Sequence, residues 1–301
     1  MAMTRGNQGR TSRLRPALAL APLVLWLSCL PPAFAQDEAP ESQAEPSAAQ
    51  LADEFSDPLT TLPQLFFKDA YTPAVYGTPG WINRVVARVI VPRLPRYSLF
   101  PFVQLVRPTF SLVTVPDGRG GERTAFGDMQ LFDLAVLPWP GKESGLAMGF
   151  GPIFVFPTAT DRLAGQGAWQ LGPAFGMIYK GFPGWLLGCL IQDPISFAYT
   201  SHDRKPVGTL LFQPVVLKHI WRGLYAKSGD ATWTLDWRNG SSATVPLSFG
   251  LGYVIVRPGS PPVNFFVSGE WMAYRHDAPV APQTTVHFGV TVAFPEWRPW
   301  S

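Results

Sequence analysis

The last strongly patterned segment of the chain alternates between two kinds of side chain. In residues 285–294 every second position is large and apolar, and the positions between are small or polar. Successive side chains of a strand point to opposite sides, so a period of two predicts a β-strand with two different faces. The apolar set is Val286, Phe288, Val290, Val292 and Phe294; the opposite set is Thr285, His287, Gly289, Thr291 and Ala293.

The same alternation recurs upstream, and no window beyond residue 35 has a convincing helical period. A soluble β-sandwich would also alternate, so the period alone does not decide the architecture. Segments of about 10 to 15 residues match tilted membrane-spanning strands and exceed the five or six residues usual in a sandwich. Aromatic residues near segment ends are typical of the two interfacial girdles of a membrane barrel. They are Trp139, Trp169, Trp185, Trp221, Trp237 and Tyr274.

Long and short connections alternate between the expected strands. The sequence therefore predicts an all-β fold, an antiparallel transmembrane β-barrel with short periplasmic turns and longer extracellular loops. Adding a strand at 84–92 and one within 65–80 gives twelve strands, which we predict, with ten as the alternative. The ten directly indicated strands are 99–114, 125–139, 145–158, 169–180, 185–199, 208–220, 223–237, 244–257, 262–276 and 284–295.

The first 35 residues resemble a targeting segment. Four arginines precede an apolar run at 17–30, and Ala33-Phe34-Ala35 is a typical cleavage site, so we predict a secretory signal peptide over 1–35. The run of about 14 residues is too short to cross a bilayer as a helix. These features predict Sec-type export to the outer membrane of a Gram-negative bacterium, with the export and barrel-assembly machinery as partners during biogenesis.

Removal of that segment changes the charge of the chain. Four of the 24 basic residues lie in it and none of the 21 acidic ones, which leaves 20 basic and 21 acidic residues. This near-neutral balance gives no footprint for nucleic acid. Residues 36–67 contain seven acidic residues and no Lys or Arg, which predicts a disordered linker or a luminal strap. The barrel domain is expected at 68–301, with 68–83 forming a plug or the first strand.

The chain contains none of the sequence motifs of catalysis or metal binding that we sought. It has no H-E-x-x-H, no pair of cysteines after processing, no G-x-S-x-G and no phosphate-binding loop. We therefore expect no cofactor, no metal and no enzymatic activity. A hydrolase with His202 or His287 as general base is the least favoured alternative, because Ser201 and His202 are typical of a solvated loop.

Polar residues on the inward register are the functional candidates. They line the lumen of an open barrel, or they fill a small closed barrel by bonding to one another, and the sequence leaves both interpretations open. The candidates are Gln170, Thr234, Asp236, Ser248, Glu270 and His287.

Several long stretches resemble one family of outer-membrane transporters. They are PDGRGGERTAFGDMQLFDLAVLPWP at 116–140, GPIFVFPTATDRLAGQGAWQLGPAF at 151–175, SGDATWTLDWRNGSSATVPLSFGLGYV at 228–254 and PPVNFFVSGEWMAYR at 261–275. The family is named after the meta-pathway of phenol degradation, and some members carry the label neuromedin U. The chain departs from its pattern at Ala164, where Leu is usual, and at Ala168, where a basic residue is common. By this resemblance the family-marking positions are Pro157, Thr158, Thr160, Asp161, Trp169, Gly172 and Pro173.

The resemblance and the polar inward face together predict a passive pore or transporter. Its partners would be outer-membrane lipid and a small-molecule solute, and the family name implies small aromatic or hydrophobic compounds. The alternative is a closed structural or ligand-binding barrel that transports nothing.

Overall fold

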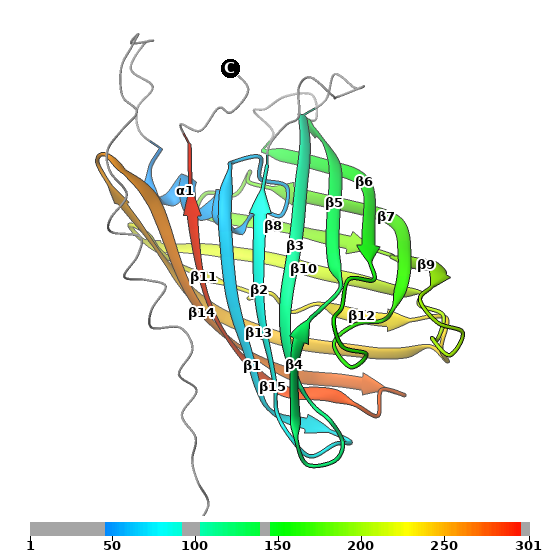
Figure 1. Ribbon diagram of the computed structural model, residues 1–301. Coiled ribbons are helices and arrows are strands. Elements are labelled where there is room, and N and C mark those ends of the chain that lie inside the picture. Colours follow the sequence, from blue (N-terminus) through cyan, green and yellow to red (C-terminus); the bar gives the residue numbers. More distant parts are fainter. Residues whose placement is uncertain (1–45, 92–102, 139–144, 296–301) are drawn as a thin grey trace, which may run out of the picture. The chain divides into compact units, whose positions relative to one another are not determined.

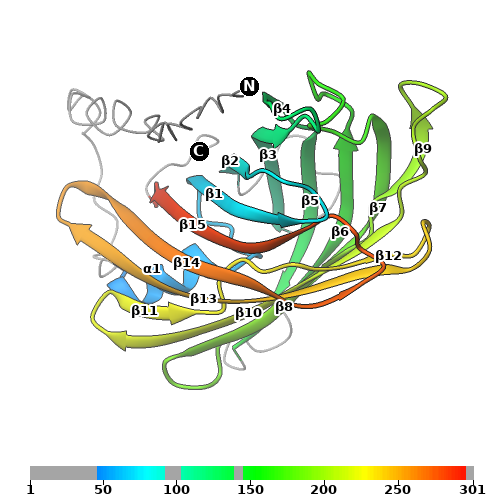
Figure 2. The same cartoon turned by 90° about the horizontal axis from the view of Figure 1, so that it is seen from below.

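A computed structural model describes residues 46–91, 103–138 and 145–295 of the chain. Within these ranges one sheet curves round on itself, and a short helix lies near one end (Figures 1 and 2). The elements are α1 (Ala48–Ser56), β1 (Gln64–Tyr76), β2 (Ile82–Ile90), β3 (Val103–Pro116), β4 (Glu122–Phe126), β5 (Met129–Pro138), β6 (Leu146–Phe156), β7 (Ala168–Tyr179), β8 (Trp185–Gln192), β9 (Ile195–Tyr199), β10 (Thr209–Trp221), β11 (Leu224–Lys227), β12 (Trp233–Asp236), β13 (Ser242–Arg257), β14 (Ser260–His276) and β15 (Ala281–Ala293).

The sheet closes into a barrel. The last strand, β15, pairs antiparallel with β1, from Gln64 opposite Ala293 to Tyr76 opposite Ala281. The other strands pair with their neighbours in turn, and β8 pairs with β10. Three positions in the wall are each filled by two segments, β4 with β5, β8 with β9 and β11 with β12, so the sheet is a closed barrel of twelve antiparallel strands. The predicted strands at 84–92 and within 65–80 are β2 and β1, which confirms the twelve-stranded prediction.

The two faces of the wall differ as the alternation predicts. On β13, Leu247, Phe249 and Leu251 are 43%, 56% and 41% exposed, whereas the intervening Gly250 and Gly252 are buried. Large apolar side chains that are half exposed all round a barrel match the lipid-facing surface of a membrane protein. The inner face carries the buried polar residues, among them Asn264, Ser268 and Thr291.

The connections distinguish the two ends of the barrel. Residues 180–184, 222–223 and 258–259 make short turns at one end, which we call the short-turn end. The connections at the other end, the long-loop end, include residues 157–167 and 200–208. Exposed aromatic residues lie at both ends, Trp185 and Trp221 at the short-turn end and Trp169, Trp237 and Tyr274 at the long-loop end. Trp139 lies outside the described residues.

In three places the sequence predicts one continuous strand where the wall contains two strand segments with a break between them. The strand expected at 185–199 is interrupted at Asp193 and Pro194, because proline has no amide hydrogen to donate to the neighbouring strand. The Asp193 amide instead donates to the Pro173 carbonyl at 3.0 Å. The strands expected at 125–139 and 223–237 are likewise interrupted, at residues 127–128 and 228–232.

The prediction of a disordered linker over 36–67 is wrong for the residues that the structure describes. Residues 46–63, which we call the plug segment, contain α1 and then lead into β1, which begins at Gln64. The helix begins with a capping box, in which the Ser47 and Gln50 side chains each accept a hydrogen bond from the other's backbone amide. The alternative prediction for this segment, a luminal strap, fits residues 46–63. Residues 68–76 belong to β1 and residues 82–83 begin β2, so the first-strand alternative fits 68–83 better than the plug. Residues 1–45 lie outside the described ones.

The plug segment packs against the inner wall through apolar side chains. Leu51, Ala52 and Leu59 are at most 3% exposed and belong to one core with inward residues of β10 and β11, such as Leu217 and Tyr225.

Among the described residues, no helix combines the length and the apolar character that a bilayer crossing requires.

Leu59 sits over two glycines of the wall. A Cβ atom added at Gly149 or at Gly176 would come within 2.7 Å of the Leu59 Cδ2 atom, so the absence of side chains there makes room for it. Leu59→Ala should weaken docking of the plug segment by about 2–5 kcal/mol, the range for truncating a buried leucine.

A broad-specificity protease added to the detergent-folded barrel would measure this effect. Faster cleavage within residues 46–63 is expected for Leu59→Ala, with the barrel itself still resistant. The matched control is Leu247→Ala, which truncates an outward leucine. Equal cleavage rates in the two variants would show that Leu59 does not anchor the plug segment.

Candidate functional site

The six candidate residues all occupy inward positions, but they do not form one site. Ser248, Glu270 and His287 lie close together on β13, β14 and β15, with Ser248 opposite Glu270 in the ladder. Thr234 and Asp236 lie at the long-loop end, where the Thr234 hydroxyl is 2.7 Å from that of Thr244. Asp236 accepts from the Arg238 and Asn239 amides and so stabilises a turn.

Gln170 stands apart from the other candidates, on β7. Its amide nitrogen donates to the Gln166 side chain in the long loop at 2.5 Å, and Gln170 is only 2% exposed. This contact agrees with the interpretation that Gln170 fills the barrel interior. The neighbourhood of Ser248, Glu270 and His287, in contrast, contains several charged side chains.

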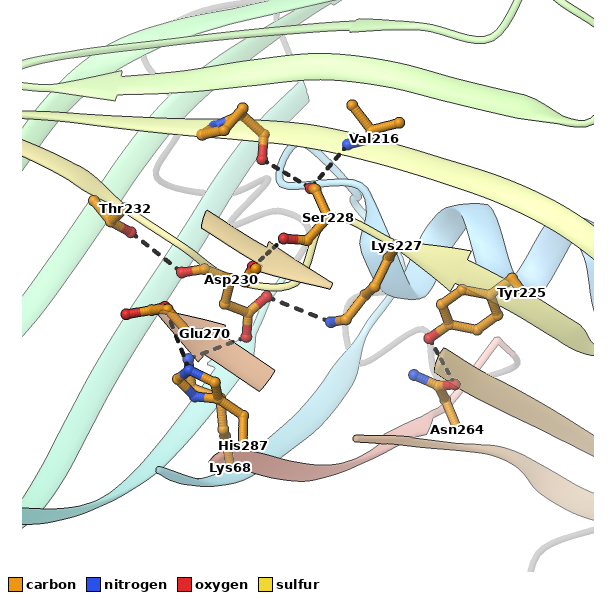
Figure 3. A network of polar contacts seen from close by, with 12 residues as sticks. Lys68, Val216, Tyr225, Lys227, Ser228, Asp230, Thr232, Asn264, Glu270 and His287 are labelled. Atoms are coloured by element: carbon orange, nitrogen blue, oxygen red, sulfur yellow. Dashed lines mark hydrogen bonds and ion pairs between the residues drawn. The ribbon is translucent and has the colours of Figure 1, made fainter. Parts of the chain in front are cut away.

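Asp230 is the centre of that neighbourhood (Figure 3). Its two carboxylate oxygens lie 3.0 Å from Lys68 Nζ and 3.4 Å from Lys227 Nζ. The three side chains are only 10% to 20% exposed. Glu270 and His287 complete what we call the charge cluster, with 3.4 Å between Glu270 Oε2 and His287 Nε2. This last contact lacks the alignment of a hydrogen bond.

Asp230 reaches this place because the wall is interrupted. Between β11 and β12 the chain turns at Gly229, which has a positive φ of 68°, and a Cβ atom there would collide with the Ser248 hydroxyl. Glycine alone satisfies both conditions without strain. Ser228 fastens the start of this segment to β10, because its hydroxyl donates to the Pro214 carbonyl and accepts from the Val216 amide.

Two further cations lie on the inner wall beside the cluster. Arg88 on β2 and Arg107 on β3, which we call the arginine pair, lie over the rings of Phe66 and Phe132 at 4.8 and 4.3 Å. Sequence reasoning missed both, as it missed Lys68, Lys227 and Asp230. Two signals were present: Arg84 and Arg88 are four residues apart on one strand face, and Ser228-Gly229-Asp230 interrupts an apolar segment.

The plug segment has its own ionic contacts with the wall. Asp53 Oδ1 lies 2.9 Å from His219 Nε2 on β10, and Lys180 Nζ lies 2.9 Å from Asp57 and 3.2 Å from Glu54. Burial disfavours the charged ammonium of Lys180, but the attraction of Asp57 and Glu54 outweighs this effect and raises the pKa of Lys180. Burial also raises the pKa of the Asp57 carboxyl, and the attraction of Lys180 opposes that rise.

Of the seven residues that the resemblance singles out, four lie in the loop after β6 and three lie on β7. The Thr158 and Thr160 hydroxyls accept hydrogen bonds from the Met129 and Phe126 amides at 2.9 and 3.0 Å, and Asp161 pairs with Arg123 at 3.3 Å. Pro157 directly follows β6, and Trp169 packs edge-on against Phe156. Gly172 and Pro173 lie beside the break at Asp193, whose carbonyl oxygen leaves no room for a Cβ at Gly172.

Two arrangements that a metal site or a hydrolase uses are not formed by the described residues at this site. They contain no group of three or more His, Cys, Asp or Glu side chains placed to hold a metal ion. Ser268 is opposite His287 in the ladder, but within the described ranges neither its hydroxyl nor the imidazole has a hydrogen-bond partner. A nucleophile and its base need such a bond.

Solved structures with a similar chain path include an outer-membrane channel, a porin and a FadL homologue. An outer membrane channel from Pseudomonas putida F1 is 11% identical, with a TM-score of 0.47 over 79% of this chain and 98% of that one. The KdgM porin is 8% identical, with a TM-score of 0.41 over 77% and 99%. A Pseudomonas aeruginosa FadL homologue is 11% identical, with a TM-score of 0.36 over 81% and 93%.

No family model and no curated protein matches the sequence. At these identities and TM-scores the solved structures assign neither a family nor an activity to the chain.

A single substitution in the charge cluster should lower the free energy of unfolding strongly. Asp230→Asn removes the negative charge between Lys68 and Lys227 and leaves two ammonium groups unpaired in a partly buried place. We expect the free energy of unfolding to fall by about 3 kcal/mol, as for a broken buried ion pair. Urea unfolding of the detergent-folded protein measures this change.

Two further variants make that result specific. Lys68→Met in the Asp230→Asn background should recover part of the loss, because one unpaired charge is removed with it. Asp161→Asn, which breaks the exposed pair with Arg123, should cost at most about 1 kcal/mol. An Asp230→Asn variant as stable as the Asp161→Asn control would contradict the central role of Asp230.

Proposed function

We propose that this chain is a passive channel or transporter for small solutes in the outer membrane of a Gram-negative bacterium. The observation that carries the proposal is the charge cluster of Lys68, Lys227, Asp230, Glu270 and His287 on the inner face of an apolar-walled barrel. Ionised groups are costly to hold away from water, so several of them on the inner face favour a wetted interior.

The plug segment determines how narrow a solute path through the barrel would be. It contacts the inner wall at β10, β13 and β14 and is fastened by Lys180 and His219 near the short-turn end. The proposal is therefore a selective path for small solutes and not a wide water-filled pore. The closed structural or ligand-binding barrel is the alternative, and permeation distinguishes the two.

The solute class and the route of biogenesis are finer proposals. Small aromatic or hydrophobic compounds are the class that the family resemblance implies. Export by the Sec route with cleavage of residues 1–35, followed by insertion with the barrel-assembly machinery, follows from the sequence pattern of the first 35 residues.

Planar-bilayer recording with the purified, detergent-folded protein tests the proposal. We expect small stepwise conductances from the wild type. A larger unit conductance is expected from the triple variant Asp53→Asn, Glu54→Gln, Asp57→Asn, because it removes the ionic contacts of the plug segment with Lys180 and His219.

The matched control removes exposed acidic groups elsewhere, with Asp117→Asn and Asp203→Asn in the long loops. This control should conduct like the wild type. The absence of any conductance from all three folded proteins, together with no swelling of liposomes in small sugars, would rule out a channel.

A further inference from the structure

A cavity lies between the plug segment and the inner wall. Its volume is about 60 Å³, and its lining includes Asp57, Arg88, Arg107, Lys227 and Asp230. A water molecule needs roughly 10–15 Å³ by this measure, so the cavity has room for a group of about four atoms of that size. A carboxylate group with its attached carbon is of this size.

The arginine pair brings two like charges together on one side of the cavity. Arg88 is opposite Thr109 in the β2–β3 ladder, and Arg107 is two residues before Thr109, so the two arginines are diagonal neighbours. Diagonal residues of adjacent strands are roughly 7 Å apart. Both side chains are inward, and Arg107 is only 4% exposed.

The hydrogen bonds of the arginine pair are incomplete. Within the part of the chain that the structure describes, the Nε atom of each guanidinium is buried without a partner. Arg107 Nη1 donates to the Pro58 carbonyl at 3.4 Å, and the aromatic rings cover one face of each guanidinium. Buried N–H groups of a charged side chain are costly to leave unpaired, so these groups are arranged for an acceptor.

The two carboxylates of the cavity do not supply that acceptor. Asp230 is held by Lys68 and Lys227, and Asp57 is held by Lys180 at 2.9 Å and accepts from the Leu59 amide. Among the described residues, no ion pair within 4.0 Å joins either arginine to an acidic group. The cavity therefore has an excess of positive charge.

We propose that the arginine pair binds the carboxylate group of a small anionic solute. A guanidinium presents two parallel N–H groups that match the two oxygens of a carboxylate, and this geometry favours a carboxylate over a single-atom anion such as chloride. Arg84, four residues before Arg88 on the same face of β2, extends the positive wall toward the long-loop end. This inference names the solute class of the channel proposed above and rests on that proposal for its transport role.

Binding is measured first, on the detergent-folded protein and without any membrane. The probes are sodium benzoate, neutral benzyl alcohol of similar shape, and inorganic phosphate, each titrated by isothermal calorimetry. We expect saturable benzoate binding at a single site by the wild type, with benzyl alcohol and phosphate at least about tenfold weaker. Replacement of either arginine by glutamine should weaken benzoate binding roughly tenfold or more, because charge-assisted hydrogen bonds are lost.

The variants include their own controls. Arg123→Gln removes the same group from an exposed position on β4 and should bind benzoate like the wild type. Arg88→Lys with Arg107→Lys keeps the charge but loses the paired N–H groups. It should therefore bind more weakly than the wild type and more tightly than the double variant Arg88→Gln with Arg107→Gln. The Lys variant keeps the test informative if the Gln variants fail to fold.

Three outcomes would overturn the assignment. They are no benzoate binding by the wild type, equal binding of benzoate and benzyl alcohol, and tighter binding of phosphate than of benzoate.

The reversal potential in a potassium chloride gradient then tests the transport role. The wild type should favour anions, and Arg88→Gln with Arg107→Gln should reduce that preference, whereas a site of purely structural importance would leave it unchanged. Benzoate binding without conductance would keep the site and refute the channel. Conductance without benzoate binding would keep the channel and refute the site.

Discussion

Closure of the sheet is the constraint on which the rest of the structure depends. In hydrocarbon an unpaired backbone amide or carbonyl costs several kcal/mol, so a sheet in a bilayer has no stable edge. In the pairing of β15 with β1, Gln64 to Tyr71 lie opposite Ala293 to Val286 without a shift. This pairing joins the first and last strands into the closed wall. Once the wall closes, the period of two assigns every side chain either to lipid or to the interior.

The interior of the barrel is organised by charge. A wall of twelve strands leaves more space than its own side chains fill, and the plug segment occupies part of it with apolar contacts at Leu51 and Leu59 and ionic contacts to Lys180 and His219. The remaining polar groups are arranged about Asp230, whose two lysines balance it, and about the arginine pair, which has no such balance. The inner wall therefore carries one group of paired charges and one pair of cations without an acidic partner, and both keep the interior polar.

The sequence was sufficient to predict the barrel, its strand number and the two faces of the central parts of β13, β14 and β15. Alternation is a local signal that closure leaves intact. It was not sufficient for α1, since a nine-residue helix in an acidic, Ala-rich segment is stabilised by the wall it packs against. Nor did it reveal Asp230, which reaches Lys68 only because the chain leaves the wall at Gly229. Ser248, Glu270 and His287 were found by alternation, but their partners are distant in sequence, and only the register of β1 against β15 brings Lys68 beside them.

The central claim is a barrel with an apolar outer face and a wetted polar interior. Cysteine accessibility in lipid tests this claim most directly. The background is Cys189→Ala, and single cysteines replace Ser248 and Glu270 on the inner wall and Leu247 and Trp271 on the outer wall. Each variant is labelled in liposomes with a water-soluble maleimide, and the inner and outer positions are compared. The barrel described here predicts labelling at the two inner positions and protection at the two outer ones. Labelling of the outer positions with protection of the inner ones would contradict it.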